Sequence, residues 1–238
     1  MKDTINRLKY FQKKSRFSEA NYLRDKNWMS GEYWRYRIYR PIIKLRFKSF
    51  RKKNNPSPWI SPAATLFFDE WLDKDKVGAE FGSGISTIFF AARTKAMVCI
   101  EHYKPWYKKV TDLFEEKGIT NIEYRYIEKD KKNKIKALTP QLEKYLKQEC
   151  SNNIMWEFQK YFESLADFED EHFDFILVDG RARPECVFYS IDKLKSGGLM
   201  VLDNSERNRY AIVFDTLGTW NNYTTSNGLT DTTFWIKP

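Results

Sequence analysis

A glycine-rich turn and a later glutamate have a spacing suited to binding a cofactor. Residues 80–87 (EFGSGIST) follow an apolar run that predicts a strand, and they lead into a predicted helix. Glycines such as Gly82 and Gly84 at this junction let a ligand approach the backbone, and the helix start offers unpaired N–H groups. Glu101 stands 17 residues after Gly84, at the end of the next predicted strand. A carboxylate there can accept hydrogen bonds from both hydroxyls of a ribose. The alternative is that the glycines only make a tight turn and that Glu101 is a solvated strand end.

The residues of the turn favour one kind of nucleoside over another. A nicotinamide dinucleotide normally requires a third glycine where Thr87 stands, because the helix must pack closely beneath a pyrophosphate. Glu80 beside the turn is unfavourable for phosphates but suits the ammonium group of a ligand. Both details favour a positively charged amino-acid nucleoside.

A second group of polar residues follows two later predicted strands. Asp179 ends one strand, and Asp203 and Asn204 end the next. Two carboxylates and an amide oxygen are hard ligands suited to Mg²⁺ or another divalent cation, which would orient an acceptor hydroxyl and lower its pKa. Alternatively, Asp203 and Asn204 cap a following helix and Asp179 stabilises a turn. Without a metal, Asp179 is the candidate general base.

Arginines surround the same predicted strand ends. Arginine can pair in a bidentate manner with a carboxylate or phosphate, which suggests an anionic acceptor such as a uronic acid, a sugar phosphate or a nucleotide sugar. The candidate substrate-binding residues are Arg181, Arg183, Arg207 and Arg209, and Arg181 is also a candidate catalytic residue. Ion pairs with Glu185, Glu206 or Asp215 are the alternative.

Alternating strands and helices must position these side chains. Residues 175–178 (FILV) and 199–202 (LMVL) are apolar on both faces, as central parallel strands covered by helices require. The predicted strands are 77–81, 96–101, 122–127, 173–179, 198–203, 222–225 and 232–236. The predicted helices are 61–72, 85–93, 105–117, near 140–149, 154–165 and 184–194. Asn227-Gly228 favours a hairpin before the last strand. The predicted fold class is α/β, a doubly wound Rossmann-like seven-stranded sheet with an antiparallel last strand.

The positive charge is concentrated before this sheet. Residues 1–56 contain 17 basic and four acidic side chains, a net charge of +13, although the whole chain of 238 residues carries only +9. We therefore expect two parts: a basic, aromatic, helical extension over 1–56 and a catalytic domain over 57–238 with an insertion at 128–158. Within the extension, aromatic and basic residues recur at helical spacing over 33–53, and Pro41 should kink or restart that helix.

Composition excludes several classes of protein. Three widely spaced cysteines and two histidines do not form a C-x-x-C zinc site, and a disulfide framework is not expected. The sequence lacks a secretion signal and a long apolar run, so we expect a cytoplasmic protein, peripheral to the inner face of the membrane if residues 1–56 bind there.

On these residues the chain resembles the class I methyltransferases that use S-adenosylmethionine. The resemblance covers about 58–238 and rests on EFGSGIST, IEHYKPWY, FDFILVDGR and LKSGGLMVLDNSER. Together with PWISPAATLFF and VDGRAR, these motifs look most like bacterial methyltransferases linked to sugar or polysaccharide biosynthesis. The resemblance implies O-methylation of a sugar, polysaccharide or glycan precursor.

The resemblance also implies roles for individual residues. Glu80 and the backbone of Gly82, Ser83 and Gly84 would hold the methionine end, with Ser86 and Thr87 in the same motif. Glu101 would hold the ribose, and His102 or Tyr103 would lie against the adenine. Asp179, Asp203 and Asn204 resemble the metal ligands of cation-dependent O-methyltransferases. The lysine that those enzymes often carry three residues after the first aspartate is replaced here by Ala182.

Two other interpretations concern residues 1–56. Eleven aromatic residues among its basic side chains could stack on bases, which suggests an RNA-modifying methyltransferase or a nucleic-acid binder. Against this, residues 57–238 carry a net charge of −4, so a nucleic-acid partner is not expected. The same aromatic and basic pattern suits an anionic membrane surface or a contact between copies of the chain. The remaining alternative is that the aromatic residues pack on the catalytic domain and only the arginines face water.

Overall fold

The computed structural model describes residues 2–22, 27–130 and 155–238. Seven strands form one sheet, β1 (Val77–Phe81), β2 (Ala96–Glu101), β3 (Ile122–Tyr126), β4 (Phe173–Val178), β5 (Leu194–Asp203), β6 (Asn221–Ser226) and β7 (Asp231–Ile236). Their order is β3-β2-β1-β4-β5-β7-β6, with β7 antiparallel to both of its neighbours and the other pairs parallel. The predicted fold class is confirmed, because the sheet is doubly wound and ends in an antiparallel hairpin.

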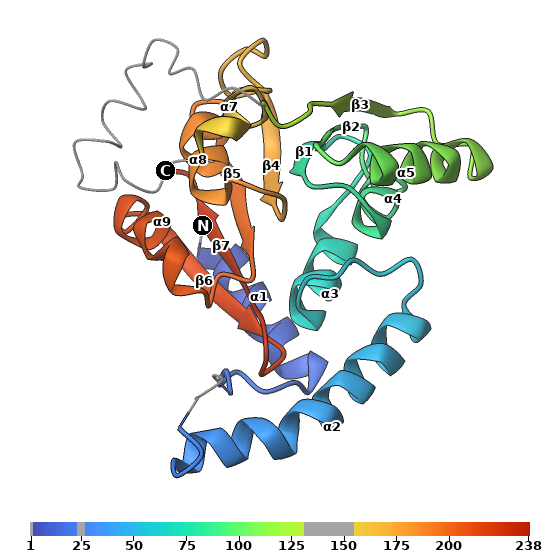
Figure 1. The fold of residues 1–238 in the computed structure, drawn as a ribbon. Coiled ribbons are helices and arrows are strands. Elements are labelled where there is room, and N and C mark those ends of the chain that lie inside the picture. Colours follow the sequence, from blue (N-terminus) through green and yellow to red (C-terminus); the bar gives the residue numbers. More distant parts are fainter. Residues whose placement is uncertain (1, 23–26, 131–154) are drawn as a thin grey trace.

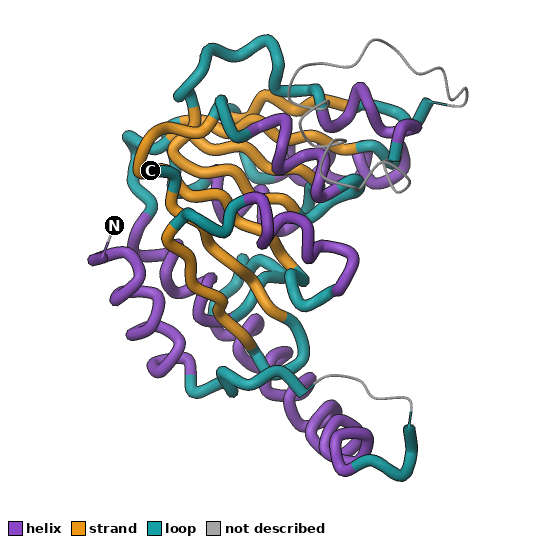
Figure 2. Tube along the Cα trace, turned by 90° about the vertical axis from the view of Figure 1, so that its left-hand side faces the viewer, coloured by secondary structure: helices purple, strands orange, loops and turns teal. Residues whose placement is uncertain are grey.

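Helices cover both faces of the sheet (Figures 1 and 2). The described helices are α1 (Lys2–Ser15), α2 (Gly31–Lys53), α3 (Pro62–Trp71), α4 (Ile85–Ala91), α5 (Lys104–Glu116), α7 (Gln159–Phe162), α8 (Arg183–Ser190) and α9 (Ala211–Thr216). Two short 3₁₀ turns, η3 (Trp156–Phe158) and η4 (Asn208–Tyr210), precede α7 and α9. Side chains of α1, α3 and α4 share one apolar cluster with one face of the central strands, and those of α7, α8 and α9 share another with the opposite face.

Local sequence explains where several elements begin and end. Ser61 caps α3 by accepting a hydrogen bond from the Ala64 N–H, and Pro62 occupies the first turn, as predicted. The central strands β4 and β5 are buried on both faces over their apolar runs. The helix predicted over 184–194 is wrong in its second half, because α8 ends at Ser190 and β5 already begins at Leu194. The pairing of β4 with β5 shifts in register between Phe173 and Phe175, which lets the strand continue through Gly197 with its positive φ of 76°.

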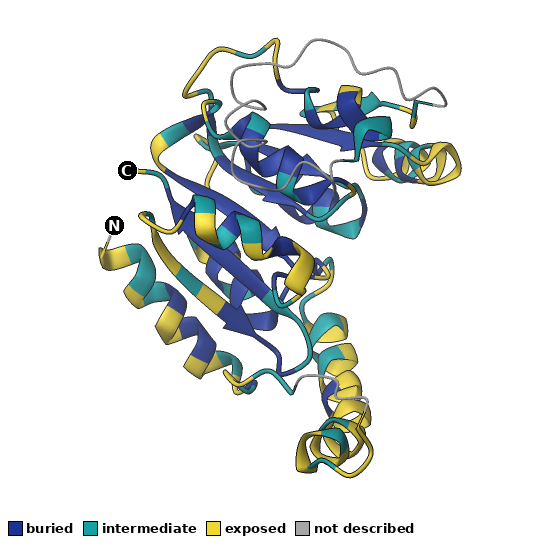
Figure 3. Cartoon of the chain, turned by 60° about the vertical axis from the view of Figure 1, so that its left-hand side comes forward, coloured by how far each residue is buried: buried dark blue, intermediate teal, exposed yellow. Residues whose placement is uncertain are grey.

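The N-terminal extension consists of two helices with different surroundings. Helix α1 packs against α3 and β6, and Leu8 and Phe11 are buried there. The Gln12 amide both donates to the Ser226 carbonyl and accepts from the Ser226 N–H, so α1 is tied to the backbone of β6. Helix α2 runs through Pro41 without the predicted restart and lies at the edge of the molecule, mostly exposed (Figures 1 and 3). The boundary at residue 56 therefore stays a prediction, because α1 belongs to the same apolar core as the sheet.

Two predicted helices fall wholly or partly outside the described residues. The helix predicted near 140–149 lies outside them, and of the helix predicted over 154–165 they contain η3 and α7. In the part of the chain that the structure describes, no helix is both long and apolar enough to cross a membrane.

Candidate active site

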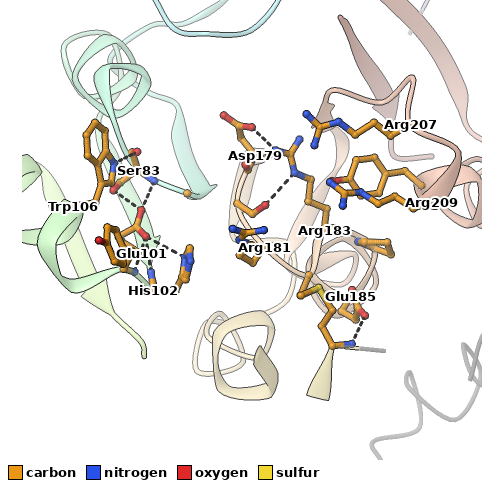
Figure 4. Close-up of a pocket in the computed structure, with 17 residues that line it drawn as sticks. Ser83, Glu101, His102, Trp106, Asp179, Arg181, Arg183, Glu185, Arg207 and Arg209 are labelled. Carbon is orange, nitrogen blue, oxygen red and sulfur yellow. Dashed lines mark hydrogen bonds and ion pairs between the residues drawn. The ribbon is translucent and has the colours of Figure 1, made fainter. Parts of the chain in front are cut away.

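The parallel strands open onto a cavity at their carboxyl ends. The cavity has a volume of about 860 Å³, within the range typical of sites for small ligands. Figure 4 shows a group from the first half of the sheet facing a group from β4 and the loops after β5. The cavity is lined by Gly82, Ser83, Glu101, His102, Tyr103, Trp106, Met155, Asp179, Gly180, Arg181, Ala182, Arg183, Pro184, Glu185, Arg207, Arg209 and Tyr210.

The glycine turn brings the ends of β1 and β4 into close contact. Gly82 has a φ of +95°, and a Cβ atom there would lie 2.9 Å from the backbone of Gly180. Thr87, at the third position of α4, accepts a hydrogen bond from the Gly84 N–H and donates one to Glu80. The turn is thus held by a buried threonine, and only Gly82 and Ser83 of it line the cavity.

Glu80 was predicted to contact the cofactor, but its side chain lies in the core and not on the cavity wall. Its side chain is fully buried, and its Oε2 accepts hydrogen bonds from Thr87 (2.6 Å) and Cys99 (3.6 Å). Burial raises the pKa of Glu80 to about 8, so its carboxyl group is protonated at neutral pH in this structure. Glu80, Gly84, Ser86 and Thr87 were predicted to bind the cofactor, but none of them lines the cavity. Thr87 and Glu80 instead hold the turn through the hydrogen bonds that link Gly84 to Thr87 and Thr87 to Glu80.

Glu101 lies where the sequence predicted, on the cavity wall at the end of β2. Its Oε1 accepts from the N–H groups of His102 and Tyr103, both at 2.8 Å. Its Oε2 accepts from the Ser83 N–H at 3.2 Å and the Ser83 hydroxyl at 2.9 Å. Burial alone would raise the pKa of Glu101, but the His102 side chain and the hydrogen bonds from Tyr103 and Ser83 together outweigh it and lower the pKa below its usual value. The carboxylate is therefore ionised and precisely oriented by four donors.

Aromatic side chains at the start of α5 form the wall next to Glu101. The His102 Nδ1 lies 3.1 Å from Glu101 Oε1, and Tyr103 is 60% exposed. Trp106 donates its indole N–H to the Ser83 carbonyl at 2.7 Å and lies over Gly84. The sequence analysis assigned no role to Trp106, although the run Tyr103–Tyr107 contains three aromatic residues directly after the acidic strand end. These rings can hold a planar base.

Asp179 lies across the cavity from Glu101. Its Oδ1 accepts a hydrogen bond from Arg183 at 2.7 Å, and its side chain remains 31% exposed. Burial raises the pKa of Asp179 in spite of the nearby Arg183 and Arg207 guanidinium groups. Asp203 is buried, and burial together with the charge of Asp179 raises its pKa well above the usual value.

The predicted metal site does not fit these surroundings. Arg183 donates to the Asp179 carboxylate and to the Asp203 carbonyl, the Asp203 carboxylate accepts from Thr232 at 2.8 Å, and the Asn204 side-chain oxygen accepts from Arg207 at 2.7 Å. One side-chain oxygen of each predicted ligand thus already accepts a hydrogen bond, and two of the donors are cationic guanidinium groups that would repel a divalent cation. Among the described residues, no group of three or more His, Cys, Asp or Glu side chains is arranged to hold a metal.

The four predicted substrate arginines have different roles. Arg183 is 7% exposed and hydrogen-bonds to Gly180, Asp179 and Asp203, so it joins the ends of β4 and β5. Arg181, Arg207 and Arg209 line the cavity and are exposed. Arg181 has no hydrogen-bonded or ionic partner for its side chain among the residues described. Of the ion pairs with Glu185, Glu206 or Asp215 that the sequence offered as an alternative, the described residues contain one, between Arg207 Nε and Glu206 Oε1 at 3.9 Å.

Comparison with known proteins adds a likeness of fold. No protein-family model and no curated protein matches the chain. An rRNA methylase from Streptococcus thermophilus is 15% identical with a TM-score of 0.49 and covers 73% of this chain and 95% of its own. A candidate methyltransferase from Streptococcus mutans in complex with SAH is 9% identical with a TM-score of 0.48 and covers 70% and 91%. Precorrin-6y C5,15-methyltransferase from Geobacter metallireducens is 14% identical with a TM-score of 0.47 and covers 70% and 82%. At these identities the likeness concerns the arrangement of the sheet and its helices.

Proposed function

We propose that this chain is an S-adenosylmethionine-dependent methyltransferase that methylates an acceptor oxygen. The observation that carries this proposal is Glu101, an ionised carboxylate oriented at the end of β2 beside a glycine turn and an aromatic wall. Its Oε2 accepts from the Ser83 hydroxyl, a donor whose place a ribose hydroxyl would take. The rings of His102, Tyr103 and Trp106 would hold the adenine. Because Glu80 is protonated and outside the cavity, we assign it no contact with the methionine end.

Asp179 is the general base of the proposed reaction. S-adenosylmethionine, when bound, supplies a methyl group on a positively charged sulfur. The acceptor oxygen forms the new carbon–oxygen bond as the carbon–sulfur bond breaks, the bonding pair stays on sulfur, and the hydroxyl proton goes to Asp179. A pKa raised by burial makes this carboxylate a better proton acceptor near neutral pH, and the Arg183 hydrogen bond fixes its direction. Arg181 beside it would stabilise negative charge on the acceptor oxygen.

The acceptor that these residues support best is a sugar, polysaccharide or glycan precursor with an anionic group. Arg181, Arg207 and Arg209 offer guanidinium donors on the cavity side that lies away from Glu101 (Figure 4). Guanidinium groups recognise carboxylates and phosphates through paired hydrogen bonds. The methylated atom is proposed to be oxygen because a carboxylate base lies at the site.

Calorimetry with S-adenosylhomocysteine tests the cofactor. We expect the wild-type chain to bind it and Glu101→Gln to weaken binding about 10- to 100-fold, because an amide cannot accept hydrogen bonds with both of its heteroatoms. Glu116→Gln makes the same change on the exposed surface of α5 and should bind as the wild type does. Thermal unfolding of each variant verifies that the fold is retained. Binding of NAD in place of S-adenosylhomocysteine, or equal binding by Glu101→Gln, would contradict the proposal.

We also infer a peripheral contact between α2 and an anionic membrane surface. Trp34, Ile38, Ile42 and Leu45 are each at least half exposed and recur at helical spacing, so they form one apolar face. The segment that carries this face, residues 1–56, has a net charge of +13, which is complementary to anionic lipids. A contact between copies of the chain through the same face is the competing outcome of the test described in the Discussion.

A further inference from the structure

A second cavity lies between α2 and the carboxyl edge of the sheet. Its volume is about 780 Å³. We call it the α2 cavity. It is lined by Tyr36, Arg40, Lys44, Phe47, Lys48, Arg51, Trp59, Asp179, Asp203, Asn204, Asn227, Leu229 and Thr230. Tyr36, Arg40, Lys44 and Lys48 follow one another at intervals of four positions, and Phe47 and Arg51 lie beside them, so one face of the helix forms one wall.

The wall formed by α2 is strongly cationic. Arg40, Lys44, Lys48 and Arg51 line it, and none of them forms an ion pair with an acidic side chain in the described part of the chain. The acidic residues on the opposite wall are Asp179 and Asp203, which are both partly neutralised by Arg183. Four cations without an ion-pair partner along one wall of a cavity favour an anionic ligand.

The same wall contains an ordered aromatic platform. The Arg51 guanidinium lies 3.6 Å from the centre of the Trp59 ring, and its Nε and Nη2 are 3.4 and 3.5 Å from the Ser57 carbonyl. Phe47 contacts Trp59 edge to face, with 6.4 Å between the ring centres. Trp59 is nevertheless 62% exposed, so this platform is fixed from one side and open on the other. An open aromatic ring of this kind can cover the apolar face of a ligand ring.

Asp179 connects the two cavities. It lines both the cavity that contains Glu101 and the α2 cavity. A cofactor held by Glu101 and a second ligand held by α2 would therefore meet at the carboxylate that we assign as general base. The positions of these residues also give α2 a role that the sequence did not indicate, because none of its cations was predicted to bind substrate.

We propose that the α2 cavity is the acceptor site and binds a small hydroxyl compound that carries a carboxylate or a phosphate. The anionic group lies against Arg40, Lys44 and Lys48, the ring of the compound lies on Trp59, and its hydroxyl reaches Asp179. This inference rests on the proposed methyltransferase function. It places the anionic group of the acceptor on the cations of α2 in place of Arg181, Arg207 and Arg209, which line the other cavity.

Charge variants on α2 in the full chain test this assignment. Lys44→Gln with Lys48→Gln removes two charges inside the cavity, and Lys52→Gln with Lys53→Gln removes two exposed charges from the same helix outside it. The probes are glucose 6-phosphate, glucuronate and neutral glucose, measured by calorimetry at low salt. We expect the wild type to bind an anionic probe and the cavity variant to bind it at least about ten-fold more weakly. The Lys52/Lys53 variant should bind within about two-fold of the wild type. A preference for the phosphate or the carboxylate probe identifies the anionic group.

The experiment separates this inference from the proposed function. S-adenosylhomocysteine should bind equally to the wild type and to both charge variants. Three results would overturn the inference without contradicting the proposed methyltransferase function. They are an equal loss of anionic-probe binding in both variants, binding of glucose as tight as that of the anionic probes, and no binding of either anionic probe. A 20-nucleotide RNA that binds the wild type and is weakened equally by both variants would assign the charges to nucleic acid instead. Failure of S-adenosylhomocysteine to bind the wild type would overturn the proposed function itself.

Discussion

Two glutamates on adjacent strands experience opposite environments. Glu80 in β1 is enclosed by the core, and burial outweighs the hydrogen bonds from Ser86, Thr87 and Cys99, so its pKa rises to about 8. Glu101 in β2 receives backbone N–H groups and the Ser83 hydroxyl, and its pKa falls. Glu80 is thus a neutral carboxyl group within the core, whereas Glu101 is an ionised carboxylate that can accept hydrogen bonds. Depth of burial and hydrogen-bond donors together decide which carboxylate is ionised and available for binding.

The protonation of Glu80 predicts a specific pH dependence of stability. In the folded chain its carboxyl group keeps a proton up to a pH of about 8, whereas in the unfolded chain it ionises near pH ~4.3. Between these values the folded state holds a proton that the unfolded state has lost, so the free energy of unfolding falls as the pH rises. Glu80→Gln should remove about 2–5 kcal/mol of this fall. Urea unfolding at pH 5, 6, 7 and 8 measures it.

Glu116→Gln is the control for this titration. Glu116 is exposed on α5, so its variant should follow the pH dependence of the wild type. Asp203 and Glu206 also have raised pKa values, and both residues are unchanged in every variant. A Glu80→Gln chain with the wild-type slope would mean that Glu80 is ionised in the folded protein.

At the scale of the element, α2 presents three different sides. Ile43 is buried and its Cδ1 lies against Gly228 of the β6–β7 loop, which fixes the helix to the sheet. Lys44 and Lys48 face the α2 cavity. Ile38 and Leu45 are 58% and 69% exposed on the side turned away from the cavity. A helix of 23 residues can therefore bind an acceptor and a surface at the same time.

The exposed side of α2 predicts membrane association. We expect the full chain to co-sediment with vesicles of phosphatidylserine and phosphatidylcholine, and much less with phosphatidylcholine alone. Ile38→Ser with Leu45→Ser should reduce the bound fraction several-fold, because insertion of the apolar face is lost. Tyr10→Ser, an exposed position on α1, should have little effect.

A second measurement shows whether the apolar face of α2 contacts a membrane or another copy of the chain. Light scattering after size exclusion gives the mass of the wild type and of the Ile38→Ser/Leu45→Ser chain. Unchanged sedimentation together with a dimer that this variant dissociates would assign the face to a contact between copies and contradict the membrane proposal.

At the scale of the whole molecule, the first helix is part of the apolar core that contains the sheet. Leu8 is fully buried and Phe11 is 2% exposed, in the same cluster as Phe67 and Phe234. The N-terminal segment is therefore divided, with α1 completing one face of the sheet and α2 extending from it (Figure 3). A chain that begins at residue 57 would expose the surface of α3 and β6 that α1 covers.

One substitution made in each N-terminal helix tests this division. Leu8→Ala should lower the free energy of unfolding by about 2–5 kcal/mol, because it leaves a cavity in the core. Leu45→Ala on exposed α2 should change it by less than about 0.5 kcal/mol. Urea unfolding followed by circular dichroism measures both, and a single transition with an unchanged slope shows that α1 unfolds with the sheet. A Leu8→Ala chain as stable as the wild type would show that α1 is not part of the cooperative unit.

The order of strands and helices was determined by the sequence itself. Apolar runs over 175–178 and 199–202 are long enough to specify central strands, and the predicted bounds 77–81 and 96–101 are those of β1 and β2. Glu101 and Asp179 could be predicted as site residues because each lies at the carboxyl end of a parallel strand of the same sheet. These inferences depend on local periodicity and on the rule that parallel strands share one open edge.

The roles of individual side chains at that edge were decided only by the tertiary structure. Glu80 and Glu101 are the same residue type at similar positions, and only the packed donors around each one separate a neutral carboxyl group from an ionised one. Arg183 was predicted to bind substrate. In the folded chain it instead donates hydrogen bonds to the Asp179 carboxylate and to the Asp203 carbonyl, at the place where the metal was predicted. The cations of α2 lie more than 100 residues before Asp179 in the chain. Their shared cavity is a consequence of long-range packing, which no local pattern encodes.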